Sequence, residues 1–212
     1  MQGHHSLAVD NSTHLNVNWD FEDYNIDSLP ADYAPGHGWG VINGVLPPGG
    51  ELLTGSANME VARDNLYNNS VPFNRADETG ATREQHQWLD SVGTPGPIRF
   101  AINDTDLKEG ETATLKIAVA PELLMSGGAF MGAAEQSLGL DVTYGNDTLH
   151  ITMGDFNNNW TGPVDWSHFK DFSMVVNGTA DTHDHLEVQG TGGGMMVGLA
   201  IDCITLQTDH II

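Results

Sequence analysis

Apolar side chains recur at every second position in several short stretches of the chain, and this period is typical of β-strands. In the clearest stretch, 138–153, apolar residues alternate on both sides of Gly145, Asn146 and Asp147, a turn whose residues tolerate positive φ. We expect a hairpin there and further strands within 15–23, 51–61, 86–91, 98–102, 112–119, 172–176, 186–188 and 195–206. Short strands separated by Gly, Asn and Asp turns, without a repeated helical pattern, predict an antiparallel β-sandwich.

The segments between these strands differ in composition. Residues 28–50 are rich in Pro and Gly, which predicts a long surface connection anchored by Trp39 and Val41. Residues 62–85 are polar, and a loop of that length in a compact domain commonly has a function, so this segment is a candidate to face a ligand. One short helix is expected near 122–125, before the helix-breaking pair Gly127 and Gly128.

The last expected strand is apolar on both faces. A period of two places residues 199, 201 and 203 on one face and residues 200, 202, 204 and 206 on the other. Asp202 then lies among apolar side chains, where an unpaired carboxylate would be costly or would stay protonated. Asp202 therefore needs a partner, and a cation is the simplest one.

The first strand, within 15–23, alternates cleanly and ends in Phe21, Glu22 and Asp23. Together with the last strand, which contains Ile201, Asp202 and Ile204, it resembles the galactose-binding-like jelly-roll modules of carbohydrate-active proteins and bacterial surface adhesins. The resemblance spans 15–206 and includes the stretches 38–39, 59–61, 87–91 and 109–115. Two features depart from it: residues 62–85 are long and unlike the family pattern, and Cys203 stands where such modules usually have Asp or Asn.

The resemblance implies a jelly-roll sandwich whose first and last strands meet at one edge and hold a structural Ca²⁺, with Glu22 and Asp202 as ligands. Calcium takes roughly six to eight oxygen ligands, so Asp20 and Asp23, together with backbone carbonyls, would complete the site. The alternative is that Glu22 and Asp23 are solvated surface acids of an acidic protein.

An aromatic-rich connection, 154–166, is the candidate ligand-binding surface. Flat aromatic rings beside amides and carboxylates provide what a sugar needs, a stacking platform and hydrogen-bond partners. The alternative is that the tryptophans of this loop fold back over the core, as single tryptophans commonly do. The candidate ligand-binding residues are Phe156, Asn158, Trp160 and Trp166, together with Glu60 and Asp90 from the stretches that resemble the adhesin modules.

Charge and length narrow the possible partners. The 212 residues are 39% apolar and carry 7 Lys+Arg against 29 Asp+Glu, a formal charge of −22. Such acidity argues against nucleic acid and anionic membranes and favours divalent cations or a high-salt environment. One cysteine excludes an internal disulfide, and no apolar run approaches the roughly 18 residues of a membrane span, so membrane insertion is not expected.

Known catalytic patterns are missing from the sequence. It has no Gly-x-Ser-x-Gly, phosphate-binding glycine loop or His-Glu-x-x-His. His183 and His185 could point the same way on a strand, but a third metal ligand is not evident.

We expect a non-enzymatic, extracellular or cell-surface module that binds carbohydrate or a peptide terminus and depends on Ca²⁺. It would be a monomeric part of a longer chain, with residues 1–10 a native extension or cloning scar and 11–208 a single domain. The alternatives are a jelly-roll polysaccharide lyase or glycoside hydrolase, with acids or His86 in a groove, and a purely structural spacer.

Overall fold

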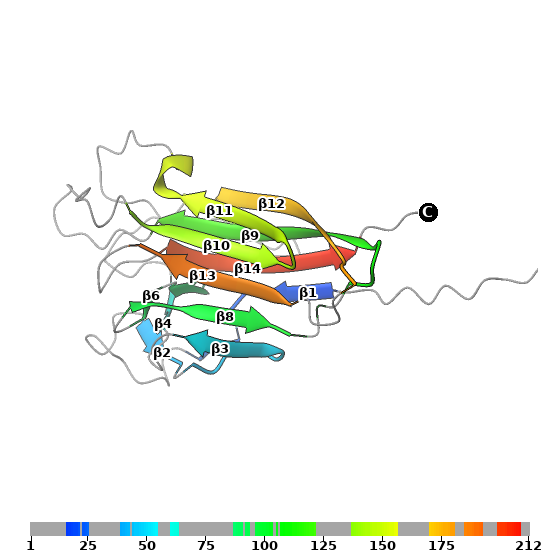
Figure 1. The fold of residues 1–212 in the computed structure, drawn as a ribbon. Helices are drawn as coiled ribbons and strands as arrows, with labels where there is room; N and C mark the ends of the chain where they lie inside the picture. The colour runs from blue at the N-terminus through cyan, green and yellow to red at the C-terminus, as the bar shows by residue number, and fades with distance from the viewer. Residues whose placement is uncertain are drawn as a thin grey trace, which may run out of the picture.

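The structure is a computed structural model. It describes residues 16–21, 23–25, 39–42, 44–54, 60–63, 87–90, 92–93, 96–103, 105, 107–121, 137–156, 170–180, 185–192 and 199–208. These residues form two antiparallel sheets packed face to face, the β-sandwich that the strand pattern predicts (Figure 1).

The larger sheet has seven strands in the described part of the chain. Its order is β12-β9-β14-β5-β4-β2, and β1 also pairs with β14. The bounds are β1 (Asn16–Trp19), β2 (Trp39–Val41), β4 (Glu60–Arg63), β5 (Gln87–Asp90), β9 (Thr112–Pro121), β12 (Lys170–Asn177) and β14 (Leu199–Thr208).

The smaller sheet has five strands in the order β11-β10-β13-β8-β3. A separate two-stranded ribbon joins β6 to β7, and a short 3₁₀ turn, Met153–Asp155, follows β11. The bounds are β3 (Gly50–Thr54), β6 (Val92–Gly93), β7 (Gly96–Pro97), β8 (Arg99–Ile102), β10 (Gly139–Tyr144), β11 (Asp147–Thr152) and β13 (Leu186–Thr191).

The winding of the chain is that of a jelly roll. From β8 onward the chain crosses repeatedly between the sheets: β9, β12 and β14 lie in the larger sheet, whereas β8, β10, β11 and β13 lie in the smaller one. The first strand meets the last, because Asn16 to Trp19 pair antiparallel with Gln207 to Ile204. The expected jelly-roll sandwich is therefore confirmed.

Local sequence signals predicted some elements well and missed others. The hairpin expected at 138–153 is β10–β11, with Tyr144 opposite Asp147 across the turn. The segment 28–50 was expected to be a loop, but it contains β2, where Trp39 pairs with Ala62, and the first residue of β3. The helix expected near 122–125 lies outside the described residues.

The last strand departs from the expected period of two. Its register with β9 shifts between Asp202 and Thr205, and Cys203 has a φ of 48°. This β-bulge reverses the alternation, so Ile204 and Leu206 face the core together with Leu199 and Ile201. The expectation that Ile204 and Leu206 share a face with Asp202 was wrong, because an extra residue had been inserted into the strand.

Asp202 lies on the face of the larger sheet that points away from the core. Its partner on β9 is Ala118, which has no exposed surface, and Asp202 itself is only 1% exposed. The carboxylate is therefore buried, as predicted, but it lies on the outer face of the larger sheet and not between the two sheets.

Among the described residues, no helix combines the length and apolar character needed to cross a membrane.

Candidate functional site: a cavity at the end of the first strand

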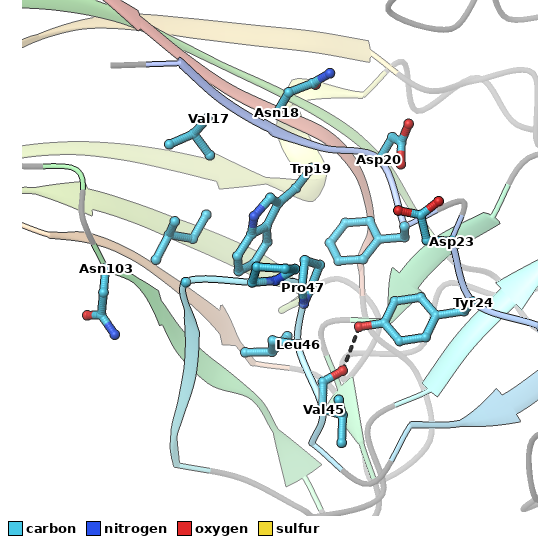
Figure 2. A pocket seen from close by; sticks show the side chains of 14 residues that line it. Val17, Asn18, Trp19, Asp20, Asp23, Tyr24, Val45, Leu46, Pro47 and Asn103 are labelled. Carbon is cyan, nitrogen blue, oxygen red and sulfur yellow. Dashed lines mark hydrogen bonds between the residues drawn. The ribbon is translucent and has the colours of Figure 1, made fainter. Parts of the chain in front are cut away.

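A cavity of about 660 Å³ lies where β1 ends. Three segments that are distant in sequence surround it: residues 17–21 and 23–24 at the end of β1, the turn 45–49 before β3, and residues 102–103 at the end of β8 (Figure 2). Among the described residues, the lining combines apolar and aromatic side chains with the carboxylates and amides of four residues. These four are Asn18, Asp20, Asp23 and Asn103.

Two buried aromatic side chains form one side of the cavity. Trp19 is 6% exposed, and its ring stacks on Phe100 with centroids 5.9 Å apart. Phe21 meets Trp19 edge to face at 6.2 Å. Gly50 makes room for this packing, because a Cβ there would lie 2.6 Å from the Trp19 ring. The aromatic side is therefore fixed by the core.

Tyr24 closes another side of the cavity. Its hydroxyl donates a hydrogen bond to the backbone oxygen of Val45 at 2.5 Å and so ties the segment after β1 to the turn before β3 (Figure 2). Burial, and then the negative charge of Asp23, raise the pKa of Tyr24 to about 12. The phenol therefore stays protonated and keeps this hydrogen bond at any physiological pH.

The polar side chains bring two carboxylates and two amides to the same cavity. Asp23 and Asn18 are exposed, and Asp20 and Asn103 are half-buried. The amide of Asn103 donates to Glu51 at 3.4 Å, which leaves its carbonyl oxygen for other partners. Hydrogen-bonding groups thus stand beside an apolar and aromatic wall, the usual composition of a small-molecule site.

The backbone takes an uncommon conformation where the cavity forms. Phe21 has a φ of 59°, in the left-handed region that residues other than glycine rarely adopt. Positive φ is also found at Cys203, on the strand that pairs with β1. Such strain costs of order 1–3 kcal/mol at each residue and tends to gather at functional sites.

β14 changes its neighbour at this point. On one side it pairs with β5 through Ala200 and Ile201, and with β1 from Ile204 onward. Asp202 and Cys203 lie between these pairings, and one oxygen of Asp202 accepts the Cys203 N–H at 2.8 Å. The buried carboxylate therefore stabilises the bulge where β1 joins the sheet.

The four predicted calcium ligands are only partly placed. Asp20 and Asp23 line the cavity, Asp202 is buried on the neighbouring strand, and Glu22 lies outside the described residues. Within the described ranges, no group of three His, Cys, Asp or Glu residues is positioned to hold a metal ion. The calcium site stays a prediction.

The predicted aromatic platform is not assembled from described residues. Phe156 is 5% exposed and packs edge to face on Phe172, with centroids 5.7 Å apart, so it belongs to the core. Its ring offers no open face for stacking. Asn158, Trp160 and Trp166 lie outside the described residues, and Glu60 and Asp90 lie on β4 and β5 with side chains that the structure does not describe.

Several cavity residues were missed as ligand-binding candidates from the sequence. Trp19 was predicted to face inward, and Asp20 and Asp23 were assigned to calcium, but Tyr24 and Asn103 gave no signal. The turn at 45–49 contains Pro47, Pro48 and Gly49. These residues predicted a loop, but they did not indicate that the loop would lie beside the end of β1.

No protein family and no curated protein matches this sequence. Some solved structures are similar in shape. The Stig cyclase Fisc from Fischerella sp. TAU, in complex with an indole compound, is 17% identical with a TM-score of 0.42, over 92% of this chain and 98% of that one. The adhesin domain of Lys-gingipain from Porphyromonas gingivalis is 12% identical with a TM-score of 0.40, over 92% and 98%. A xylan-binding domain from Paenibacillus barcinonensis is 12% identical with a TM-score of 0.35, over 91% and 92%. Similarities of this size leave the function to be argued from the site.

Proposed function

We propose that this protein is a carbohydrate-binding module and that the cavity beside β1 binds a saccharide without transforming it. The observation that supports this is the cavity itself, because about 660 Å³ lies within the range of small-molecule sites. Its walls pair aromatic and apolar surface with carboxylates and amides. A sugar ring needs both, since its C–H face packs on apolar side chains and its hydroxyls require hydrogen-bond partners.

The side chains divide these roles. Tyr24, Leu46 and Pro47 offer apolar surface, whereas Asp20 and Asn103 offer oxygen and amide groups to hydroxyls. The aromatic side is already packed and Tyr24 is held by Val45, so binding costs little ordering of the protein.

The proposal extends to a structural Ca²⁺ held by Glu22 and Asp202. Asp202 fits such an ion, because its carboxylate supplies a hard oxygen donor in a buried position. Asp20 and Asp23 line the cavity, so we assign them to the saccharide rather than to the ion. A bound ion would stabilise the junction of β1 and β14, from which the residues lining the cavity extend. The site of action would be extracellular or at the cell surface, where Ca²⁺ is plentiful.

Binding is tested with a glycan array followed by calorimetry on the glycans that bind. Tyr24→Ala should weaken binding about tenfold, because it removes the aromatic face. Val175→Ala is the matched control, since Val175 is 57% exposed on β12 and does not line the cavity. Equal affinities of the two folded variants would contradict the site.

Two further measurements separate the alternatives. Release of products from neutral or acidic polysaccharides would show that the protein is a lyase or hydrolase and would refute the proposal that it binds saccharides without transforming them. Binding of free peptide termini without binding of any glycan would show a peptide module instead.

Calcium is tested by thermal unfolding. An ion that binds only the native state adds about 2.7 kcal/mol when its free concentration is about a hundredfold above Kd. EDTA should therefore lower the melting temperature, and Asp202→Asn should reduce the response. A melting temperature that ignores Ca²⁺ and EDTA but rises steeply in molar NaCl would indicate a salt-adapted acidic surface in place of an ion site.

A further inference from the structure

The charge of the cavity restricts which saccharides it can accept. Among the described residues, its lining contains two carboxylates, Asp20 and Asp23, and no Lys or Arg. Both carboxylates come from the short segment that follows β1, on the same side of the cavity as Tyr24 (Figure 2). A ligand in the cavity therefore meets two carboxylates, and the described lining residues include no basic side chain.

The described basic side chains are engaged or located elsewhere. Arg99 pairs with Glu187 at 2.6 Å on the smaller sheet. The Lys170 ammonium donates to the Asp155 backbone oxygen at 2.9 Å and lies over the Phe172 ring. Lys108 is exposed before β9 and Lys116 is exposed on β9, and none of these four residues is among the described residues that line the cavity.

We propose that the cavity selects an amino sugar, a saccharide with a free, protonated amine, and rejects uronic acids. This inference rests on the proposed carbohydrate-binding function. An ammonium group would form charge-assisted hydrogen bonds to Asp20 and Asp23, which are stronger than bonds between neutral groups. A uronate would bring a third carboxylate into the same space, and the formal charge of −22 adds repulsion at longer range.

The experiment compares three oligosaccharides of the same length in calorimetry: a chitosan tetramer, the N-acetylated chitin tetramer and an oligouronate. The amine form should bind about tenfold more tightly than the acetylated form, since acetylation removes the charge but keeps the ring. The oligouronate should bind more weakly than both. The preference for the amine should shrink in high NaCl, because screening weakens exposed charge pairs.

Variants connect this preference to the cavity. Asp20→Asn and Asp23→Asn should each lower the affinity for the chitosan tetramer several-fold and leave the chitin tetramer nearly unchanged. Glu109→Gln is the matched control, because it removes one negative charge from an exposed turn outside the cavity. An equal effect of all three variants would show that the preference comes from net charge alone and would overturn the assignment.

The outcomes for the two proposals can be told apart. If the neutral chitin tetramer or the oligouronate binds at the cavity at least as tightly as the chitosan tetramer, the amine selection is wrong but the carbohydrate-binding function stands. If no glycan binds, the proposed function fails. If the amine preference appears only in EDTA and disappears with Ca²⁺, the ion occupies Asp20 and Asp23, and the amine assignment is refuted.

Discussion

Removing one buried hydroxyl tests how the core is tied to the crossover between the sheets. Tyr144 has no exposed surface, and its hydroxyl donates to the Thr105 backbone oxygen at 2.6 Å and accepts the Leu107 N–H at 2.8 Å. The crossover 103–108 runs between β8 and β9, so these bonds fix the connection between the two sheets. Tyr144→Phe keeps the ring and removes the hydroxyl that makes both bonds.

The cost follows from the two backbone groups left behind. A typical hydrogen bond contributes about 0.5–1.5 kcal/mol, and a buried group that loses its partner costs about 1–3 kcal/mol. Thr105 and Leu107 are 0% and 3% exposed, so water does not readily replace the hydroxyl. We expect the free energy of unfolding to fall by about 2–4 kcal/mol, which corresponds to a melting temperature lower by roughly 5–15 °C in a protein of this size.

Urea unfolding followed by tryptophan fluorescence measures this loss. Tyr24→Phe is the matched control, because it also removes one tyrosine hydroxyl and one hydrogen bond to a backbone oxygen, that of the exposed residue Val45. Water can satisfy the Val45 oxygen, so this variant should lose less than about 1 kcal/mol. Equal losses of unfolding free energy in the two variants would refute the argument that burial of the backbone partners sets the cost of removing a tyrosine hydroxyl.

Two further predictions concern the smaller sheet and its turns. Burial raises the pKa of Glu187, but hydrogen bonds from His185 and Arg99 lower it more, so the net shift is downward from 4.5. Its stabilising contribution is therefore present above pH 4.5 and lost as the pH falls through the lowered pKa, and Glu187→Gln should flatten the acid limb of a plot of stability against pH. Gly192→Ala should destabilise far more than Gly110→Ala: both glycines have positive φ, but a Cβ at Gly192 would overlap the Ser137 backbone oxygen, whereas one at Gly110 meets nothing within 4 Å. If the melting temperature falls equally in both glycine variants, the positive φ alone sets the loss of stability and the overlap with Ser137 adds nothing.

The parts of the fold that the sequence predicted are those set by local pattern. In β10–β11 the inward residues, the turn and the pairing all lie within one short stretch, so alternation and turn chemistry predict the hairpin together. The bulge in β14 could not be read in this way, because Cys203 is not a residue that signals positive φ. Nothing in the alternation of 199–206 marks the extra residue.

The cavity could not be predicted because its parts are distant in sequence. Tyr24 gains its role only when its hydroxyl meets Val45, 21 positions away. Asn103 reaches the cavity because β8 pairs with β3, a contact decided by the whole sheet order. The sequence assigned Asp20 and Asp23 to calcium and gave no sign that these acids line the same cavity as Trp19.

One irregularity connects the fold to the site. Along one edge, β14 pairs first with β5, up to Ile201, and then with β1, from Ile204 onward. The bulge lies between these two pairings. β1 ends at Trp19, and the positive φ of Phe21 turns the chain so that the Phe21 ring returns to the core while Asp20 and Asp23 remain at the cavity. The turn at Phe21 therefore separates the acids of the cavity from the core, and the packing of Trp19 against Phe100 fixes the aromatic side of the cavity.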